Sequence, residues 1–560
     1  MSSIKKQLPI ICIIAIGAVV RFYGIANIPP SLNWDEISHG YNAYSILHSG
    51  RDEWGEYMPI IFRAYGDYKL PVYIYLTAIS EYFFGLTPFA IRLPSIIAGL
   101  VTIFYSYRLI KLIFGEKVAT LTALLVAIEP WSLFLSRAAL EGNLALTFIV
   151  SGIYYLFEGL KSPAKLTLSI LLLGVSVWTY NSARVFVPML LISFGVLFYR
   201  EIVQSVKMDT RLSALTILIG LILFVPMGFQ LLETSGSARY ENIAIINDGA
   251  VAEIEAKRNE TSLPSLPSRL IYNRPIYFLK AFSVNYIAHF LPNYLFISGA
   301  SDYQFNVPDH GLLFIIDVLF FYLGGWLLFK DRKEYRTKLF ILAWLLLGPV
   351  AGSLTRGAPH TLRNIVSLPI PMLLITLGIT QLSQKKYFAI AYLFIISILF
   401  GNYIGNYSTS YRTNYSWSWQ YGHEQMAALT NKYYDNYDKI VVTKKYGEPH
   451  EFLLFYGAKN NYQWYAQPEH YFNDPNLVRF NQSNWWWVDR FDKFYFVNDW
   501  EVPHEFGKQF VLESKSSFTC NNSDSKCLLV TSPGNVPEKW TKIESVDFLD
   551  GQTAFEFYEI

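Results

Sequence analysis

The chain contains many long apolar runs separated by short polar loops, and this pattern limits what it can fold into. A helix needs about 20 apolar residues to cross a bilayer. Runs of roughly this length lie at 8–26, 88–111, 117–136, 142–160, 164–180, 182–200, 212–232, 311–329, 337–354, 361–383 and 387–404. The pattern predicts an α-helical polytopic membrane protein with about eleven transmembrane helices.

Composition supports this fold class and excludes one class of function. With 52% hydrophobic and 16% charged residues, the 560-residue chain is too apolar for an ordinary soluble protein. The net charge is +2, and the sequence has no basic stripe, zinc-type Cys/His spacing or Gly-rich phosphate loop, which argues against a nucleic-acid partner. The run 8–26 lacks a cleavage site, so we expect a retained helix, and Lys5 and Lys6 place the N-terminus in the cytoplasm.

The segment 70–87 decides which loops face the cytoplasm. It is apolar but slightly short, it is rich in Tyr and Phe, and it carries Glu81. If it does not cross the membrane, the basic short loops face the cytoplasm, as the positive-inside rule requires. These loops hold Arg108, Lys111, Lys117, Lys161, Lys165, Arg200, Lys207, Arg211, Lys330, Arg332, Lys333, Arg336, Lys338, Lys385 and Lys386. We therefore predict an interfacial helix on the outer leaflet.

This topology places four parts of the chain on the outer face of the membrane. They are residues 27–87, the turn at 137–143, the loop 233–310 and the tail from 405. The tail changes to a polar and aromatic composition with short alternating runs, which predict a soluble α/β domain. We thus expect a transmembrane domain at 1–404 and an extracytoplasmic domain at 405–560, in which Cys520 and Cys527 are able to form a disulfide.

Two adjacent carboxylates, Asp35 and Glu36, follow the first apolar run in the stretch PPSLNWDEISHGYNAY. Asn33 precedes them as an expected N-cap, so both acids lie in the first turn of a predicted helix. One interpretation is that they only complement the helix dipole, an effect of about 0.3–1 kcal/mol each. The alternative is a functional site, because the same outer segment also supplies Asp67 and Lys69.

Further charged and titratable residues lie at the outer ends of predicted spanning helices. They are Arg137, Glu141, Asp309, His310, Arg356, His360 and Arg363. Charges near hydrocarbon are costly, by about 2.5–3.5 kcal/mol at mid-bilayer, so they usually pair or mark a site. Arg137 and Glu141 have the spacing of a structural ion pair, and the arginines at 356 and 363 are equally suited to anchor headgroups. Either histidine alone favours an ordinary hydrogen-bonding role.

Taken together, these residues form an outward-facing cluster of carboxylates and cations. Such a cluster suits transfer from a phosphate-linked donor whose lipid tail lies in the membrane. The cations would hold the phosphate leaving group, and a carboxylate would accept a proton from the acceptor hydroxyl.

Several motifs follow one another in the order and spacing of an enzyme family over roughly residues 8–200. They are Trp-Asp-Glu at 34–36, then YKLPVYIYL, RLPS and SRAALEGN. In this order they resemble the polyprenyl-phosphate-dependent glycosyltransferases with the GT-C fold, nearest to the protein O-mannosyltransferases and the lipid A aminoarabinose transferases. The chain departs from the family pattern at Leu70, which replaces a proline, and at Tyr68, where some relatives carry an acid.

The resemblance implies an integral membrane enzyme that transfers a sugar, with inversion, from an undecaprenyl- or dolichyl-phosphate donor on the outer face. By motif position, Asp35 would be the general base, with Glu36 orienting the base or the acceptor. The implied phosphate ligands are Lys69, Arg137, Arg356 and Arg363. The substrate-binding candidates are Asp67, Glu141, His310 and His360. Asp67 would replace the missing acid.

The resemblance leaves the cofactor, the acceptor and the sugar open. No metal ligand is predicted, and a divalent cation stays an alternative because the oligosaccharyltransferase relatives need one whereas the nearer families do not. The acceptor is a protein, a lipid or a glycan. Three rival functions stay open: a transporter or lipid flippase, a non-enzymatic membrane protein that presents its C-terminal domain, and a polymer ligase on the same fold. The absence of an internal repeat and the few charges at mid-membrane depth argue against a transporter.

Overall fold

The structure is a computed structural model, which describes residues 2–65, 67–233, 236, 240, 242–330, 334–382, 386–461, 463–482, 485–505, 507–520 and 525–560. The chain divides into two compact units, which are described separately. Unit 1 comprises Met1–Tyr23 and Ser95–Ile404, and unit 2 comprises Gly24–Pro94 and Gly405–Ile560. The sequence pattern assigns the outer segment after the first helix to the transmembrane domain, whereas its contacts group it with the tail.

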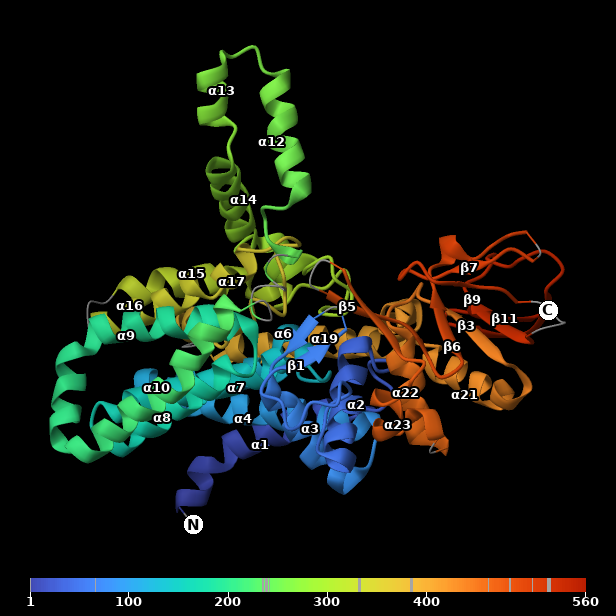
Figure 1. Ribbon diagram of the computed structural model, residues 1–560. Helices are drawn as coiled ribbons and strands as arrows, with labels where there is room; N and C mark the ends of the chain where they lie inside the picture. Colours follow the sequence, from blue (N-terminus) through green and yellow to red (C-terminus); the bar gives the residue numbers. More distant parts are fainter. Residues whose placement is uncertain are drawn as a thin grey trace. The chain divides into compact units, whose positions relative to one another are not determined.

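Unit 1 is helical, as the apolar runs predict (Figure 1). Its α-helices include α1 (Ser2–Phe22), α4 (Pro88–Phe114, beginning in unit 2), α5 (Glu116–Ile128), α6 (Pro130–Leu135), α7 (Glu141–Gly159), α8 (Pro163–Val177), α9 (Asn181–Met208), α10 (Thr210–Leu232), α12 (Asp248–Glu260), α13 (Ser265–Ile271), α14 (Arg274–Ala288), α15 (Val318–Lys330), α16 (Tyr335–Leu347), α17 (Val350–Ser353), α18 (Ile370–Leu382) and α19 (Lys386–Asn406, ending in unit 2). Helix α8 packs against α7 and α10, and α15 packs against α18. The segment 233–310 holds α12, α13 and α14.

Among the described residues, four helices are long and apolar enough to cross a membrane. They are Pro88–Phe114, Asn181–Met208, Thr210–Leu232 and Tyr387–Asn414. Other predicted spans are shorter or interrupted. Pro130 begins α6 within the run 117–136, and Pro349 lies between α16 and α17 within the run 337–354. Glu129, directly before Pro130, is extended with ψ of 138°, the conformation that a following proline favours, so the run 117–136 forms two helices. The run 337–354 is likewise interrupted between Leu347 and Val350. The prediction of eleven spans is therefore not confirmed.

The N-terminal part of unit 2 contains α2 (Trp34–Ser49), a hairpin of β1 (Phe62–Ala64) and β2 (Asp67–Lys69), and α3 (Pro71–Phe84). Asn33 caps α2 as predicted, and Glu36 completes a capping box. Helix α2 ends at Gly50, whose φ of 69° is a left-handed cap that glycine adopts without strain. The predicted helix within 70–87 is confirmed as α3, while its place on a membrane surface stays a prediction.

The C-terminal part of unit 2 is built around a seven-stranded sheet of order β10-β11-β9-β3-β6-β5-β4. Its strands are β3 (Lys439–Thr443), β4 (Val478–Gln482), β5 (Trp485–Phe491), β6 (Phe494–Val497), β9 (Cys527–Thr531), β10 (Thr541–Asp547) and β11 (Thr553–Glu559). The central strand β3 runs parallel to β6 and β9, and the other pairs are antiparallel. A smaller hairpin pairs β7 (Phe510–Val511) with β8 (Ser517–Phe518).

Helices complete this part as an α/β domain, which confirms the fold predicted for the tail. They are α20 (Arg412–Asn414), α21 (His423–Tyr433), α22 (Pro449–Asn461) and α23 (Pro468–Phe472). Helix α22 packs against both α21 and α2, and so joins the tail to the first outer segment within unit 2. Cys520 and Cys527 form the disulfide for which their spacing allows, and both lie in the core with Val441, Val497 and Leu529.

Candidate active site

Two of the predicted site residues, Asp35 and Lys69, meet in unit 2. Asp35 lies in the first turn of α2, and Lys69 is the last residue of β2. Lys69 Nζ donates a hydrogen bond to Asp35 Oδ1, and the two form an ion pair. The Lys69 side chain is 5% exposed, whereas the Asp35 side chain is 34% exposed. The structure thus holds a solvent-accessible carboxylate against a buried cation.

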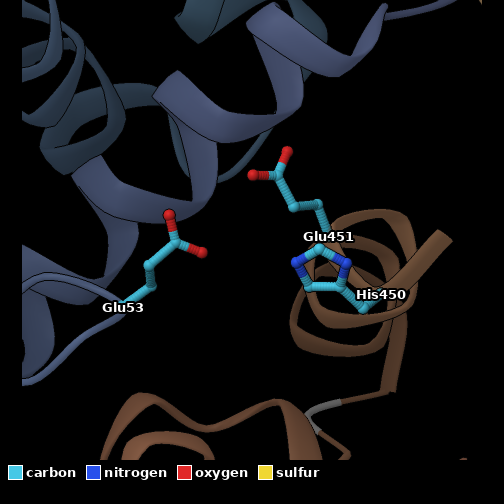
Figure 2. A group of neighbouring side chains, drawn as sticks. All are labelled: Glu53, His450 and Glu451. Carbon is cyan, nitrogen blue, oxygen red and sulfur yellow. The ribbon is translucent and has the colours of Figure 1, made fainter. Parts of the chain in front are cut away.

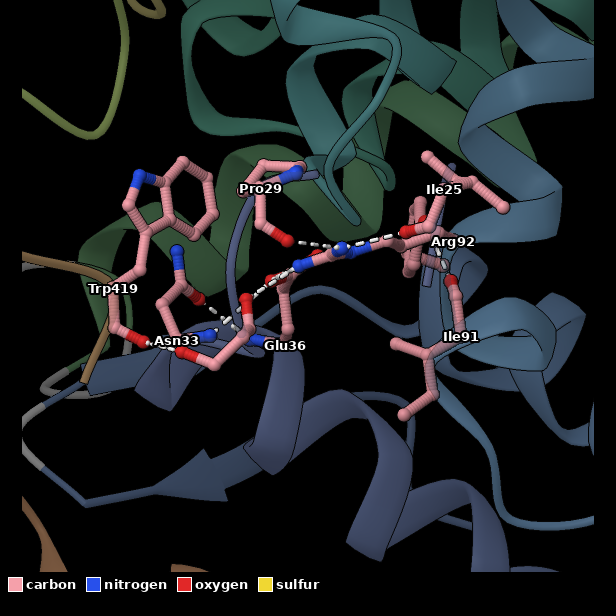
Figure 3. Close-up of polar contacts among 9 residues, drawn as sticks. Ile25, Pro29, Asn33, Glu36, Ile91, Arg92 and Trp419 are labelled. Atoms are coloured by element: carbon pink, nitrogen blue, oxygen red, sulfur yellow. Dashed lines mark hydrogen bonds and ion pairs between the residues drawn. The ribbon is translucent and has the colours of Figure 1, made fainter. Parts of the chain in front are cut away.

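Glu36, the second predicted catalytic acid, is fully buried and bound on both oxygens (Figure 3). Arg92 Nε donates to Glu36 Oε1 at 2.8 Å, and Arg92 Nη2 donates to Glu36 Oε2 at 2.9 Å. The backbone N–H of Asn33 also donates to Oε2 at 3.2 Å. Arg92 Nη1 donates to the carbonyls of Ile25 at 2.7 Å and Pro29 at 3.1 Å. Glu36 therefore anchors the start of α2 and positions its neighbour Asp35.

A second group of titratable side chains lies in the same unit and was not predicted from the sequence. Glu53 follows α2, and His450 and Glu451 lie in the first turn of α22. All three are buried, and one ligand atom of each lies within 4.8 Å of the others (Figure 2). Asn42 Nδ2 donates to Glu53 Oε1 at 2.8 Å. These residues, called here the Glu53–His450–Glu451 cluster, come from segments about 400 residues apart.

Burial changes the protonation of this cluster. It raises the pKa of Glu53 to about 8, and it raises the pKa of Glu451 well above its ordinary value, with Glu53 and Glu448 adding like charge. Burial also lowers the pKa of His450 well below its ordinary value. Both effects have one cause, because a dry interior disfavours the charged form of every group.

The cluster and the Asp35–Lys69 pair belong to one polar interior of unit 2. The positive charge of Lys69 lowers the pKa of Glu451, whereas the negative charge of Asp35 raises it. The charge of Lys69 also lowers the pKa of Glu53. Arg479 closes the other side, because its Nη2 donates to the Glu53 carbonyl at 2.7 Å. A negatively charged group that enters this region would meet Lys69, and a cation would meet the carboxyls.

Arg137, a predicted phosphate ligand in unit 1, binds the end of α1. Its guanidinium donates to the carbonyls of Val20, of Arg21 at 3.1 Å and of Tyr23 at 2.7 Å, and the side chain is buried. Carbonyls at a helix C-terminus lack intrahelical donors, and a cation there also complements the helix dipole. The structure thus gives Arg137 a structural role, and its phosphate role stays a prediction.

Replacing Arg137 by alanine is expected to destabilise unit 1 by about 2–4 kcal/mol, because buried carbonyls lose a charged donor. The expected result is a lower Tm in detergent with an unchanged Kd for polyprenyl phosphate. Arg137→Lys should recover only part of the stability, because one ammonium lacks the planar fork of a guanidinium. A normal Tm combined with weaker lipid-phosphate binding would show that Arg137 is a donor ligand.

Three further predicted residues meet in the stretch that follows α17 in unit 1. Arg363 Nη1 donates to Thr355 Oγ1 at 2.6 Å and to the Arg356 carbonyl at 3.0 Å. The Arg363 backbone N–H donates to His360 Nδ1 at 3.3 Å, and the His360 N–H donates to His289 Nε2 at 3.2 Å. Arg356 is exposed. Hydrogen bonds thus join Arg363 to both Arg356 and His360, as expected of residues that share one region.

The remaining predicted substrate-binding residues are Glu141, His310 and Asp67. Glu141 is the first residue of α7 and is partly exposed. His310 packs its ring against Tyr403 with centroids 5.4 Å apart, and burial lowers the pKa of His310. Asp67 begins β2, but its side chain lies outside the described part of the structure.

A cavity in unit 1 brings Arg363 together with a residue that the sequence did not suggest. The cavity has a volume of about 280 Å³, and its wall includes Arg184, Arg363, Tyr180 and Leu231. Arg184 Nη1 donates to Gln230 Oε1 at 2.6 Å. Arg184 Nη2 is buried and has no hydrogen-bond partner among the described residues. Two guanidinium groups in a largely apolar wall suit an anionic headgroup with an apolar tail.

Comparison of the sequence with known families supports the expected resemblance to the mannosyltransferases. Residues 69–229 match the family described as dolichyl-phosphate-mannose-protein mannosyltransferase. The match begins at Lys69 and ends in α10. It confirms the resemblance predicted from the motifs. A sequence comparison with curated proteins finds no match.

Several solved structures resemble the chain at low sequence identity. The apo oligosaccharyltransferase of Archaeoglobus fulgidus is 13% identical, with a TM-score of 0.49, over 80% of this chain and 63% of that protein. Apo ArnT from Cupriavidus metallidurans is 14% identical, with a TM-score of 0.45, over 82% and 76%. ArnT bound to undecaprenyl phosphate is 10% identical, with a TM-score of 0.44, over 99% and 98%. The chain thus spans only 63% of the length of the Archaeoglobus protein.

Proposed function

We propose that this chain, whose residues 69–229 match the dolichyl-phosphate-mannose-protein mannosyltransferase family, is a membrane glycosyltransferase. It moves a sugar from a polyprenyl-phosphate-linked donor to an acceptor hydroxyl on the outer face of the membrane, with inversion. The observation that carries this proposal is the Asp35–Lys69 pair, in which a partly exposed carboxylate lies beside a buried ammonium group. Such a pair provides both a proton acceptor and a ligand for the leaving phosphate.

The reaction needs one proton acceptor and one stabilised leaving group. The Asp35 carboxylate takes the proton of the acceptor hydroxyl as its oxygen forms a bond to the anomeric carbon of the sugar. The bond between that carbon and the phosphate oxygen breaks, and polyprenyl phosphate leaves with the electron pair. Lys69 stabilises the charge that develops on the phosphate. A single displacement of this kind inverts the anomeric configuration.

We assign the Asp35–Lys69 ion pair to the protein before the donor binds. In a displacement, the attacking and leaving oxygens lie on opposite faces of the anomeric carbon. Lys69 Nζ therefore has to exchange Asp35 for the donor phosphate, which competes for the same ammonium group. This exchange frees Asp35 to accept a hydrogen bond from the acceptor hydroxyl. Glu36 and Arg92 hold the first turn of α2 in place while the partners of Asp35 change.

The cavity that contains Arg184 and Arg363 supports a second, cationic contribution to donor binding. Its arginines would hold a phosphate, and its apolar wall would contact the lipid. This assignment retains Arg363 as a phosphate ligand and adds Arg184. Arg356 remains a proposal for binding the donor phosphate, and His360, His310, Glu141 and Asp67 remain proposals for substrate binding.

The proposed topology follows the positive-inside rule. It has about eleven spans, a cytoplasmic N-terminus, and an active site and C-terminal domain outside the cytoplasm. The four long apolar helices support an integral membrane protein. The acceptor is a protein, a lipid or a glycan. A protein acceptor is supported by the family's description.

Replacing Lys69 by glutamine is expected to raise the Kd for a polyprenyl-phosphate sugar by about 10- to 100-fold. This range corresponds to the loss of a charged hydrogen bond, about 1.5–3 kcal/mol. Lys445→Gln is the matched control, because Lys445 lies in the same unit with 55% of its side chain exposed. Binding to purified protein in nanodiscs provides the measurement. A Kd that does not change in Lys69→Gln would remove Lys69 from the phosphate site.

A further inference from the structure

The proposed transfer reaction does not use the Glu53–His450–Glu451 cluster. Its three side chains carry the donor atoms that divalent metals prefer, and one such atom of each lies within 4.8 Å of the others. Glu53 comes from the segment after α2, and the other two come from the first turn of α22 (Figure 2). Figure 2 shows both carboxylates and the imidazole around a common space.

His450 provides independent support for a ligand at this place. Its side chain is 1% exposed, and neither ring nitrogen has a hydrogen-bond partner among the described residues. Glu448 Oε2 lies 3.4 Å from His450 Nδ1, which is too long for a good hydrogen bond. Buried polar groups are almost always satisfied, so an unpaired buried imidazole that faces two carboxyls indicates a missing partner. Neutral imidazole is the commonest protein ligand of metal ions, so a metal ion is a fitting partner for His450.

The charges around the cluster also favour a cation. Four carboxyls lie here: those of Asp52, Glu53 and Glu451 are buried, and that of Glu448 is 16% exposed. The neighbouring cations already have other partners. Lys69 pairs with Asp35, Lys444 pairs with Asp489 at 3.1 Å and Glu513 at 3.0 Å, and Arg479 donates to Tyr65 and to a backbone carbonyl. A divalent ion would supply the positive charge that this group of carboxyls lacks.

We infer that Glu53, His450 and Glu451 bind one divalent transition-metal ion, with Zn²⁺ as the best fit. Zinc accepts both imidazole nitrogen and carboxylate oxygen as ligands, with metal–ligand distances of about 2.0–2.2 Å. Such distances bring the ligand atoms of a tetrahedral site to within about 3.5 Å of one another. The ligand atoms therefore have to move about 1 Å closer to one another on metal binding, through small rotations of the two glutamate side chains.

The inferred ion joins two segments that are far apart in the sequence. It fixes the segment that carries Glu53, next to α2, to the start of α22, and it lies beside the Asp35–Lys69 pair. Because the ligands come together only in the folded chain, metal binding stabilises the folded state. Three protein ligands also leave a fourth position of the tetrahedron open.

Metal content and thermal unfolding of the full chain test this inference without any assay of sugar transfer. Tag-free protein in detergent should contain about one zinc per chain by mass spectrometry. Removal of the metal with EDTA should lower the Tm by about 5 °C, and ZnCl₂ should restore it. CoCl₂ should give the visible absorption of a tetrahedral site. Protein that holds no metal and whose Tm responds to neither ZnCl₂ nor CoCl₂ would overturn the inference.

Variants assign the ligands. Glu451→Gln and Glu53→Gln keep the side-chain shape, and each should lose the bound zinc and the Tm response. The matched controls are Glu424→Gln, at a carboxylate that is 46% exposed, and His470→Gln, at an exposed histidine of the same unit. Both controls should bind zinc normally. Zinc binding that persists in both folded cluster variants would contradict the assignment, and so would its loss in either control.

Discussion

Replacing Asp35 by asparagine is expected to lower the rate of sugar transfer by about 10²- to 10⁴-fold. An amide has nearly the same shape as a carboxylate, but it does not accept the proton of the acceptor hydroxyl. Its oxygen still accepts the hydrogen bond of Lys69, so the first turn of α2 and the fold of unit 2 should remain intact. Donor binding should be largely unchanged, because the proposed phosphate ligand is Lys69.

The rate is measured as release of polyprenyl phosphate from a lipid-linked sugar, with Tm and donor Kd determined on the same preparations. Glu56→Gln is the matched control, because Glu56 is an exposed acid in the same outer segment. It should retain normal activity. Full transfer activity in a folded Asp35→Asn protein would assign the general base to another residue.

The second large effect concerns stability. Arg92→Met should destabilise unit 2 by about 3–5 kcal/mol, because it leaves the buried Glu36 carboxylate without its cation. The guanidinium also supplies hydrogen bonds to the carbonyls of Ile25 and Pro29 (Figure 3). Methionine fills much of the same volume, so the loss reports mainly on charge and hydrogen bonding rather than on packing.

A double variant separates the ion pair from the rest of the Arg92 interactions. Glu36→Gln combined with Arg92→Met removes the unpaired charge and should recover part of the lost stability, measured by chemical or thermal unfolding in detergent. Lys508→Met is a control, since Lys508 is 60% exposed, and its effect should stay within about 0.5 kcal/mol. A wild-type Tm in Arg92→Met would show that the pair does not hold the start of α2.

Features that depend on neighbouring residues were accessible from the sequence. The spacing of Asn33 and Glu36 predicts a capped helix start, and the structure shows both hydrogen bonds of the capping box. The alternating runs of the tail predict strands, and the structure forms them into a sheet. Motif order predicts a resemblance to a glycosyltransferase family, and the match of residues 69–229 to the mannosyltransferase model confirms that resemblance. Each of these signals is local, because caps, strand periodicity and motifs arise within a few residues.

Features that depend on distant contacts were not accessible. Glu53 and Glu451 lie far apart in the chain, and no local pattern indicates that α22 packs against α2. Arg92 stands in a family motif, but only the fold shows that it neutralises Glu36. Hydropathy also counts apolar residues without registering where a helix breaks. For this reason it predicts a single span at 117–136, which the structure divides at Pro130.

Transfer by the unmodified protein tests the central claim most directly. Purified protein in nanodiscs would be incubated with a panel of radiolabelled polyprenyl-phosphate monosaccharides and with peptide, lipid and glycan acceptors. The proposed function predicts that at least one donor is consumed, with release of polyprenyl phosphate and formation of a glycosidic bond of inverted configuration. The glycosyltransferase function would be contradicted if folded protein transferred sugar from none of these donors to any acceptor, whether or not it bound the donors.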